Sequence, residues 1–482
     1  MIYDIIVIGA GTSGGMAARQ LSKYQLKIAI LEKSSEAGGG TSKANSGIVH
    51  GGYNAIPGTL KAILNKRGNE MMDDIAEDLD ISFKRCGSLV VAFSDKDKKM
   101  LEKLYQRGVK NEIRGLSIIG KDKLLKMEPE LSDRAVGALL CTSAGIISPY
   151  ELSVGSVENA ALNGTEVFFN TEVIDIKTDE KNIKVITSKG EFLTRYLVNA
   201  AGVYGGKISE MYGDKVDIRP RKGEYLLYDA AMSDVVERII FQTPSKMGKG
   251  ILVTPTVEGN MLLGPTSQDI DDKEDFSTTK QGLKTVIDKA KKSVPTLTLK
   301  GVITSFAGLR AVSPTEDFII KINEKQNNII DVIGIESPGL SSSPAIGEYV
   351  ESLLLKVGLN AQLKKDYNPK NKKRLRFSSL SEKERKKAIE LNKLYANVIC
   401  RCEMVTEGEV IDAIKRPVGA TTLDGVKHRT RAGAGRCHGA FCSPTVMKIL
   451  SEQLNIPFEQ IHKWDNGSWI VASKTKVKKG ES

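Results

Sequence analysis

Four of the six cysteines of this 482-residue chain gather in its last fifth, where they could bind metal. They form two pairs, Cys400 with Cys402 and Cys437 with Cys442, and 34 residues lie between the pairs. Four thiolates suit either a 2Fe–2S cluster or a structural zinc ion. The first pair encloses a single residue, which departs from the usual zinc spacing of two to four. Two further cysteines stand alone in apolar surroundings, and we interpret them as reduced core residues: Cys86 and Cys141.

A glycine-rich turn near the N-terminus has the Gly-x-Gly-x-x-Gly spacing of dinucleotide sites, at Gly9, Gly11 and Gly14. It stands between an apolar β-branched strand pattern and a helical pattern, which is the context that this motif requires. The glycines permit a tight turn, close approach of the backbone to a pyrophosphate, and close packing of helix on strand. The next strand pattern ends at Glu32, 18 residues after Gly14, where a carboxylate can accept hydrogen bonds from ribose hydroxyls.

A second glycine-rich run over residues 37–42 favours a flavin dinucleotide over a nicotinamide one. It would let the backbone approach a cofactor that extends beyond the pyrophosphate to a ring. Further apolar strand patterns cover 196–202 and 329–335, and the second leads through 336–340 into a helical run. A helix N-terminus there could stabilise negative charge on a reduced isoalloxazine ring.

His50 follows the second glycine-rich run, residues 37–42, and is one of only four histidines. An imidazole there could take a hydroxyl proton while a hydride leaves the same carbon for the flavin. It could instead hydrogen-bond or covalently tether the ring. An anionic substrate needs cations, and Arg310 offers a planar fork that grips a carboxylate or phosphate. Lys249 precedes an apolar strand pattern and could be a second cation, or else an exposed loop lysine. Ser337 could hydrogen-bond substrate or flavin, or else cap a helix.

These segments resemble flavoprotein oxidoreductases of the D-amino-acid-oxidase and glycerol-3-phosphate-dehydrogenase type. Residues 44–61, 254–266 and 336–345 are similar to glycerol-3-phosphate oxidases and L-2-hydroxyglutarate dehydrogenases, and the resemblance covers about the first three-quarters of the chain. It implies that FAD is the cofactor, with His50 beside the flavin, Arg310 over its face and Lys249 as a second phosphate-binding cation. The expected FAD contacts are Gly9, Gly11, Ser13, Gly14, Glu32, Lys33, Thr41, Ser42, Asn45, Ser46, Gly47, Ala201, Gly202, Gly339 and Leu340.

The cysteine segment resembles the bacterioferritin-associated-ferredoxin-like domain, which is also found fused to anaerobic glycerol-3-phosphate dehydrogenases. The Cys-x4-Cys spacing of its second pair matches the fused forms, and the resemblance implies a 2Fe–2S cluster on all four cysteines. Zinc or unliganded thiols are the alternatives. A reduced flavin holds two electrons, whereas an iron–sulfur centre carries one electron at a time. This combination suits the delivery of electrons to a protein or quinone acceptor. We therefore expect a dehydrogenase and not an oxidase.

The expected fold is α/β, with a Rossmann-like FAD-binding domain, a mixed-sheet substrate domain and a small helical C-terminal iron–sulfur domain. The oxidoreductase part would span 1–360, and a basic linker would span 361–390. The iron–sulfur domain would follow over 391–460, with a tail over 461–482. Within the first part, we assign 1–80, 145–210 and 325–360 to FAD and 81–144 and 211–324 to substrate.

The net charge of +11 is concentrated in two segments. Residues 364–387 hold 11 basic and 3 acidic residues, and 474–482 hold 4 and 1, so the remainder is neutral. A solvated linker and tail explain this charge, and nucleic-acid binding is not expected because no such module accompanies it. The linker could instead dock an electron-acceptor subunit, so its deletion would slow turnover. No apolar run is long enough to span a membrane and no signal peptide is evident, so we expect a cytoplasmic protein.

These features predict oxidation of sn-glycerol 3-phosphate to dihydroxyacetone phosphate, with electrons leaving through the cluster. One alternative is an L-2-hydroxy acid dehydrogenase acting on a substrate such as 2-hydroxyglutarate. Another is a non-catalytic electron-transfer subunit of a larger complex.

Overall fold

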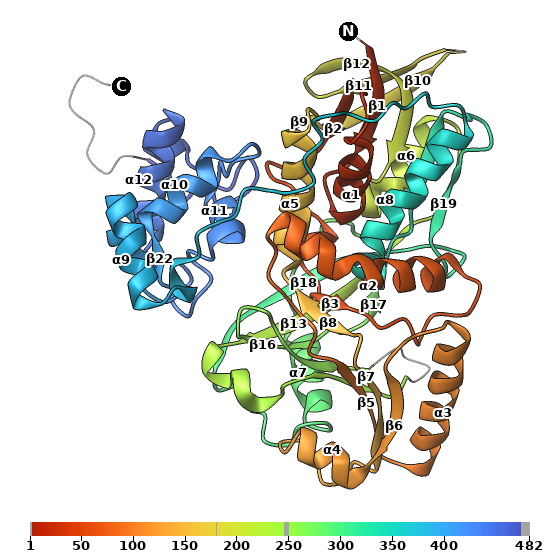
Figure 1. The fold of residues 1–482 in the computed structure, drawn as a ribbon, viewed down its shortest axis with the longest axis vertical. Coiled ribbons are helices and arrows are strands. Elements are labelled where there is room, and N and C mark those ends of the chain that lie inside the picture. Colours follow the sequence, from red (N-terminus) through yellow and green to blue (C-terminus); the bar gives the residue numbers. More distant parts are fainter. Residues whose placement is uncertain (1, 180, 245–249, 474–482) are drawn as a thin grey trace.

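The computed structural model describes residues 2–179, 181–244 and 250–473 and contains two large units and a smaller helical one (Figure 1). Lys249 and the basic tail 474–482 lie outside the described residues. Within the described ranges, no helix is both long enough and apolar enough to cross a bilayer.

The first unit is built on an eight-stranded sheet in the order β10-β11-β12-β1-β2-β9, with β20 beside β12 and β19 beside β20. The pairs β1–β2, β1–β12, β2–β9 and β12–β20 are parallel. The strands are β1 (Ile2–Ile8), β2 (Ile28–Leu31), β9 (Glu166–Phe168), β10 (Val173–Thr178), β11 (Ile183–Thr187), β12 (Gly190–Asn199), β19 (Ile319–Ile322) and β20 (Ile329–Ile333). β19 therefore belongs to this sheet, although its residues were expected in the substrate domain.

Helices cover both faces of this sheet, which explains the continuous apolar run in β1. Ile5 and Val7 face a core shared with four helices, whereas Ile6 and Ile8 face a second core shared with α6 and the β10–β11 hairpin. A strand buried on both faces has no polar alternation. The helices are α1 (Thr12–Leu21), α2 (Leu60–Leu79), α5 (Pro149–Leu162), α6 (Gly205–Met211) and α8 (Gly339–Lys356).

The second unit is a nine-stranded mixed sheet in the order β17-β13-β16-β15-β14-β5-β7-β6, with β18 paired along β13. Its strands are β5 (Ser88–Ala92), β6 (Leu116–Gly120), β7 (Gly137–Cys141), β13 (Arg219–Tyr228), β14 (Ile239–Gln242), β15 (Leu252–Pro255), β16 (Met261–Gly264), β17 (Gln268–Asp269) and β18 (Val302–Val312). Its helices are α3 (Asp95–Lys110), α4 (Lys121–Met127) and α7 (Lys280–Ala290). A small three-stranded sheet holds β3 (Ile48–Val49), β8 (Gly145–Ile147) and β4 (Phe83–Lys84).

The third unit is helical and lies beside α5 of the first unit (Figure 1). Thr406 and Glu409 form a reciprocal capping box that fixes the start of α10, where the sequence indicates a capped helix. Val410, Val426 and Leu450 are fully buried in a core of its own. Its elements are α9 (Glu382–Leu391), β21 (Val398–Cys400), β22 (Val405–Thr406), α10 (Glu407–Lys415), α11 (Leu423–Thr430) and α12 (Ser443–Leu454).

The basic segment before this unit is packed against the first unit and is not an extended solvated linker. Arg374 and Arg376 form ion pairs with the carboxylates of Asp80 and Glu151 at 3.1–3.3 Å. The two arginines lower the pKa of buried Glu151, although burial alone would raise it. Much of the local charge is therefore neutralised by acidic residues that lie far away in the sequence.

Candidate active site

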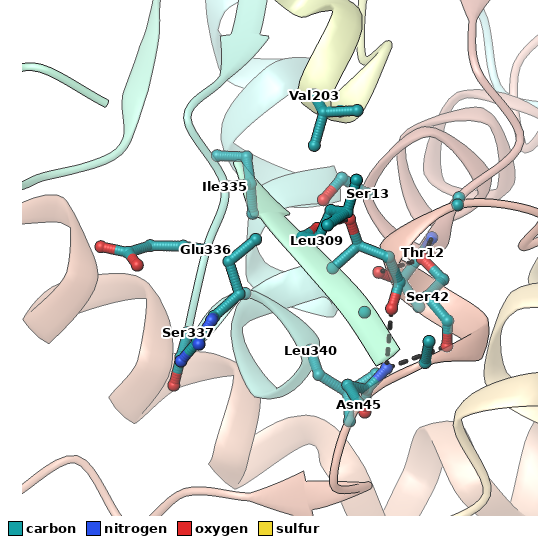
Figure 2. A pocket seen from close by; sticks show the side chains of 18 of the residues that line it. Thr12, Ser13, Ser42, Asn45, Val203, Leu309, Ile335, Glu336, Ser337 and Leu340 are labelled. Atoms are coloured by element: carbon teal, nitrogen blue, oxygen red, sulfur yellow. Dashed lines mark hydrogen bonds between the residues drawn. The ribbon is translucent and has the colours of Figure 1, made fainter. Parts of the chain in front are cut away.

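One large cavity, of about 840 Å³, lies between the first two units. The end of β1, the start of α1, the end of β2 and the loop 39–46 line its nucleotide end. His50, Arg310 and Ser337 line the same cavity. Figure 2 shows Thr12 and Ser42 on one side of it, with Glu336 and Ser337 across from them. Every candidate flavin or substrate residue that the structure describes, except Gly14 and Gly47, lines this cavity.

The first glycine turn fits a pyrophosphate because its backbone leaves no room for side chains. Gly9 has φ +101°, and a Cβ there would lie 2.5 Å from the carbonyl oxygen of Ala200. A Cβ on Gly14 would lie 2.0 Å from the carbonyl oxygen of Gly9, so Gly14 packs helix on strand without lining the cavity. Helix α1 starts directly after Gly11, so its N-terminal end faces this part of the cavity, and Thr12 N donates to Ser42 Oγ at 3.1 Å.

Glu32 directly follows β2 and has the environment of a ribose acceptor. Its carboxylate accepts hydrogen bonds from the backbone N–H groups of Ala10, at 2.7 Å, and Ser34, at 2.9 Å. Burial raises the pKa of Glu32, while these two N–H groups oppose that effect. A carboxylate has more acceptor sites than these two bonds use, so it can still accept from ribose hydroxyls.

The second glycine-rich run leads into a loop that is clamped against the substrate unit. Asn45 Nδ2 donates to the carbonyl oxygens of Thr41, at 3.2 Å, and Ser42, at 2.9 Å (Figure 2). The carboxamide Oδ1 of Asn45 accepts from Gly47 N at 2.9 Å, so Gly47 shapes the loop without lining the cavity. The hydroxyl of Thr41 donates to the carbonyl of Leu309 in β18. The loop thus joins the nucleotide end of the cavity to the strand that carries Arg310.

His50 is held by α2 through its backbone. Asn65 and Asn69 both donate side-chain hydrogen bonds to the carbonyl oxygen of His50, at 3.2 and 2.9 Å. Its Nε2 lies 3.3 Å from Ser337 Oγ, and its ring lies 5.8 Å from that of Phe241. The structure therefore brings together two predicted site residues that are 287 positions apart.

Arg310 is fixed by backbone carbonyls. Its guanidinium donates to Thr266 O at 2.7 Å and to the carbonyl oxygens of Arg221 and Lys222 at 3.3 Å. Among the described residues, no carboxylate lies within 4.0 Å of this guanidinium. A rigid cation without a protein counter-ion, lining a cavity, suits an anionic ligand.

Arg221 and Tyr225, to which the sequence assigns no chemistry, also line the cavity. Arg221 lies directly opposite Arg310 in the β13–β18 register, and Asp269 pairs with Arg221 at 2.5 Å. Lys61 and Glu336 form a mostly buried ion pair at 2.8 Å on the same wall. Only long-range strand and helix pairing brings these residues to the site, so no local motif marks them.

In space, the four clustered cysteines approach one another in two pairs that differ from the pairs in the sequence: Cys402 with Cys437, and Cys400 with Cys442. The sulfurs of Cys402 and Cys437 are 3.8 Å apart. A hydrogen bond from the Cys442 thiol lowers the pKa of Cys400 to about 6, with help from the backbone N–H groups of Gly433 and Glu403. Among the described residues, no three metal-ligating side chains converge on one ion position. Two pairs match a cluster in which each of two irons takes two thiolates.

The loops around the cysteines leave little room for larger residues. A Cβ on Gly435 would lie 2.5 Å from the Cβ of Cys402. These loops also touch the substrate unit, because Arg436 pairs with Asp229 at 3.1 Å and the imidazole of His438 hydrogen-bonds the carbonyl of Ile303. The cysteine module is therefore anchored on both large units.

Two family models match the chain in succession. The model of FAD dependent oxidoreductases matches residues 4–353, and that of BFD-like [2Fe-2S] binding domains matches residues 398–452. A glycerol 3-phosphate dehydrogenase of Caloramator mitchellensis is 46% identical over 476 residues, which cover 98% of this chain and 99% of that protein. A glycerol 3-phosphate oxidase of Mycoplasma genitalium is 32% identical over 375 residues, which cover 76% of this chain and 96% of that relative.

A solved structure agrees with these sequence matches. The L-alpha-glycerophosphate oxidase of Mycoplasma pneumoniae, reduced with dithionite and with FAD bound, has a TM-score of 0.74 to this chain at 30% identity. The alignment covers 77% of this chain and 98% of that one.

Proposed function

The chain belongs to the FAD dependent oxidoreductase family and carries a [2Fe–2S] binding domain, and on that premise we propose that it oxidises sn-glycerol 3-phosphate to dihydroxyacetone phosphate. The observation that carries the proposal is the match to a glycerol 3-phosphate dehydrogenase over 98% of the chain, through both domains. The cavity supports it, because its described part combines an imidazole with a guanidinium that lacks a protein counter-ion.

FAD bound in this cavity would supply the acceptor for the hydride of the substrate's carbinol carbon. His50 takes the proton of the same hydroxyl group at Nε2, the nitrogen that faces Ser337 Oγ at 3.3 Å. The Asn65 and Asn69 bonds fix the backbone of His50 against α2, which limits the movement needed to position the base.

Arg310 grips the phosphate group of the substrate with its planar fork. Three carbonyl acceptors fix that fork before substrate arrives, which reduces the entropy lost on binding. Lys249 serves as a second phosphate cation in this proposal, although it lies outside the described residues. The start of α8, at Gly339 and Leu340, lines the cavity, and the positive end of its helix dipole would favour negative charge on a reduced flavin ring.

Cys400, Cys402, Cys437 and Cys442 would hold the [2Fe–2S] cluster, which would supply one-electron transfer out of the protein. Cys402 is exposed, so this side of the domain is open to an acceptor. A protein or quinone acceptor is therefore part of the proposal, and a dehydrogenase is favoured over an oxidase.

Anaerobic flavin bleaching tests the proposal. Purified holoenzyme is mixed with glycerol 3-phosphate, and separately with L-2-hydroxyglutarate, while the oxidised flavin band near about 450 nm is followed. Rapid bleaching by the phosphate alone, lost in Arg310→Met and His50→Gln, is the expected result. Bleaching by the hydroxy acid alone would move the assignment to a 2-hydroxy acid dehydrogenase, because Arg310 can grip a carboxylate equally well. No bleaching with either compound would overturn both assignments.

A further inference from the structure

A short segment beyond both matched domains reaches the FAD cavity. Trp464 and Asp465 line it beside Glu32, Ser34 and Gly39. The two family models end at residues 353 and 452, so neither includes this segment. The sequence places these residues in a tail without assigned chemistry, yet they form a wall at the nucleotide end of the cavity.

The segment is docked on the loop that follows Glu32. Asp465 Oδ1 accepts a hydrogen bond from Ser35 N at 2.7 Å, and the carbonyl of Trp464 accepts from Ser35 Oγ at 3.2 Å. The indole packs against Gly39, where an added Cβ would lie 3.4 Å from Trp464 Cζ2. The wall is therefore held by specific contacts to the loop after Glu32 and to the second glycine-rich run.

Lys43 lies beside the indole at the wall of the cavity. Its ammonium nitrogen is 4.1 Å from the centroid of the Trp464 ring, and the residue lines the cavity. No carboxylate of the described residues lies within 4.0 Å of this ammonium, whose nearest acidic neighbours act only at longer range. Burial lowers the pKa of Lys43, which the negative charge of Asp465 opposes. The Lys43 ammonium therefore contacts an aromatic face but forms no close ion pair with a described carboxylate.

A stack of rings connects this contact to the [2Fe–2S] domain. The Trp464 ring meets His428 of α11 edge to face at 5.2 Å, and His428 stacks on Tyr150 of the first unit at 4.3 Å and 8°. Burial keeps the pKa of His428 well below its ordinary value, so the central ring is neutral. The indole is thus held on the side away from Lys43 by the small domain.

We propose that Trp464 and Asp465, within the segment 462–469, complete the FAD site, with Trp464 holding Lys43 so that its ammonium binds the pyrophosphate of FAD. The phosphates are the only negative charges of oxidised FAD, so they are the anion that this cation can meet. Because the segment belongs to the small domain, FAD binding and docking of that domain must strengthen each other by the same factor. The proposal rests on the FAD chemistry of the family and not on the identity of the substrate.

Titration of apoprotein with FAD tests the proposal on the full-length chain, without substrate. Lys43→Gln removes the charge, and Trp464→Leu removes the aromatic face but keeps an apolar side chain. A charge-assisted contact predicts that Lys43→Gln weakens FAD binding about 10- to 100-fold, with a shallower dependence on salt. Trp464→Leu is expected to weaken binding about 3- to 10-fold through loss of the cation–π contact. Combining the two should cost less than the product of the single effects, because both disrupt one contact.

Trp469 provides the matched control, because it is the only other tryptophan and is 59% exposed. Trp469→Leu should leave FAD affinity unchanged, and Lys43→Arg should recover most of the loss. Unchanged affinity in Lys43→Gln would overturn the assignment of the cation. An equal loss in Trp464→Leu and Trp469→Leu would overturn the role of the indole.

Hydrogen exchange gives a second readout that does not depend on the stability of any variant. FAD should slow exchange in residues 462–469 of the wild-type chain as strongly as in the loop 32–40. No change in 462–469 would refute the coupling. Because neither measurement involves turnover, a wrong substrate assignment would leave both results intact.

Discussion

The ion pair between Glu36 and Arg429 gives the sharpest test of how the small domain is attached. The carboxylate and guanidinium are 2.7 Å apart, and their side chains are 1% and 2% exposed. Glu36 also accepts from Thr421 N at 3.1 Å, and Arg429 donates to the carbonyls of Gly425 and Val418. The pair joins the loop after β2 to α11, so its loss acts directly on the interface between the domains.

Removing one charge should destabilise docking more than removing both. Glu36→Gln keeps the size of the side chain but leaves a buried guanidinium unpaired, which costs about 3–5 kcal/mol. Arg429→Met leaves the opposite charge unpaired, at a similar cost. The double variant has no unpaired charge, so we expect it to recover about 2 kcal/mol or more relative to the sum of the single variants. The exposed pair Arg67–Glu348 is the control, and Glu348→Gln should cost less than about 1 kcal/mol.

Tryptophan emission during urea titration reads this interface directly. The only two tryptophans, Trp464 and Trp469, both lie in the segment that docks beside Glu36. The emission change should come at markedly lower urea in each single variant than in wild type, with the double variant between them. Additive single and double effects, or a shift no larger than that of Glu348→Gln, would refute the reasoning.

Three further outcomes test the site. Arg310→Met should raise KM for glycerol 3-phosphate about 10- to 100-fold in steady-state assays, and Arg310→Lys should raise it less, because a charge-assisted fork is lost. Burial raises the pKa of Glu32. If FAD binding needs the ionised Glu32 carboxylate, FAD should be released as the pH falls through that raised pKa. Flavin fluorescence should detect release at a higher pH than an ordinary glutamate would give, and Glu32→Gln should flatten the profile. Cys402→Ser should abolish cluster absorbance and acceptor reduction but leave the bleaching of the flavin by substrate. Cys86→Ser should change none of these three readouts.

The nucleotide end of the site could be predicted from the sequence because its determinants are local. Gly9, Gly11, Gly14 and Glu32 follow one another within a single strand–turn–helix–strand unit, and the structure shows that unit. The α/β fold, the FAD cofactor and the [2Fe–2S] domain are confirmed by the family matches. The residue assignments at the substrate end remain predictions, which the variants described above test.

The parts that the sequence could not predict depend on distant pairing. Arg221 reaches the cavity only through the β13–β18 register, which places it opposite Arg310, 89 residues away. Trp464 belongs to a short segment with no periodic pattern, and its role depends on docking next to Ser35. The charge of Arg374 and Arg376 suggested solvent exposure because their partners, Asp80 and Glu151, lie more than 200 positions earlier.

The packed basic segment has a consequence for how electrons travel. A carrier on a free tether would collect an electron at the flavin and then swing to a second station. Here the connecting chain is fastened along the first unit by Arg374 and Arg376, and Arg416 adds a buried ion pair to Glu158 at 2.8 Å. In the proposed function, the cluster domain would therefore act as a relay held in place against the first unit, and an acceptor would have to come to it.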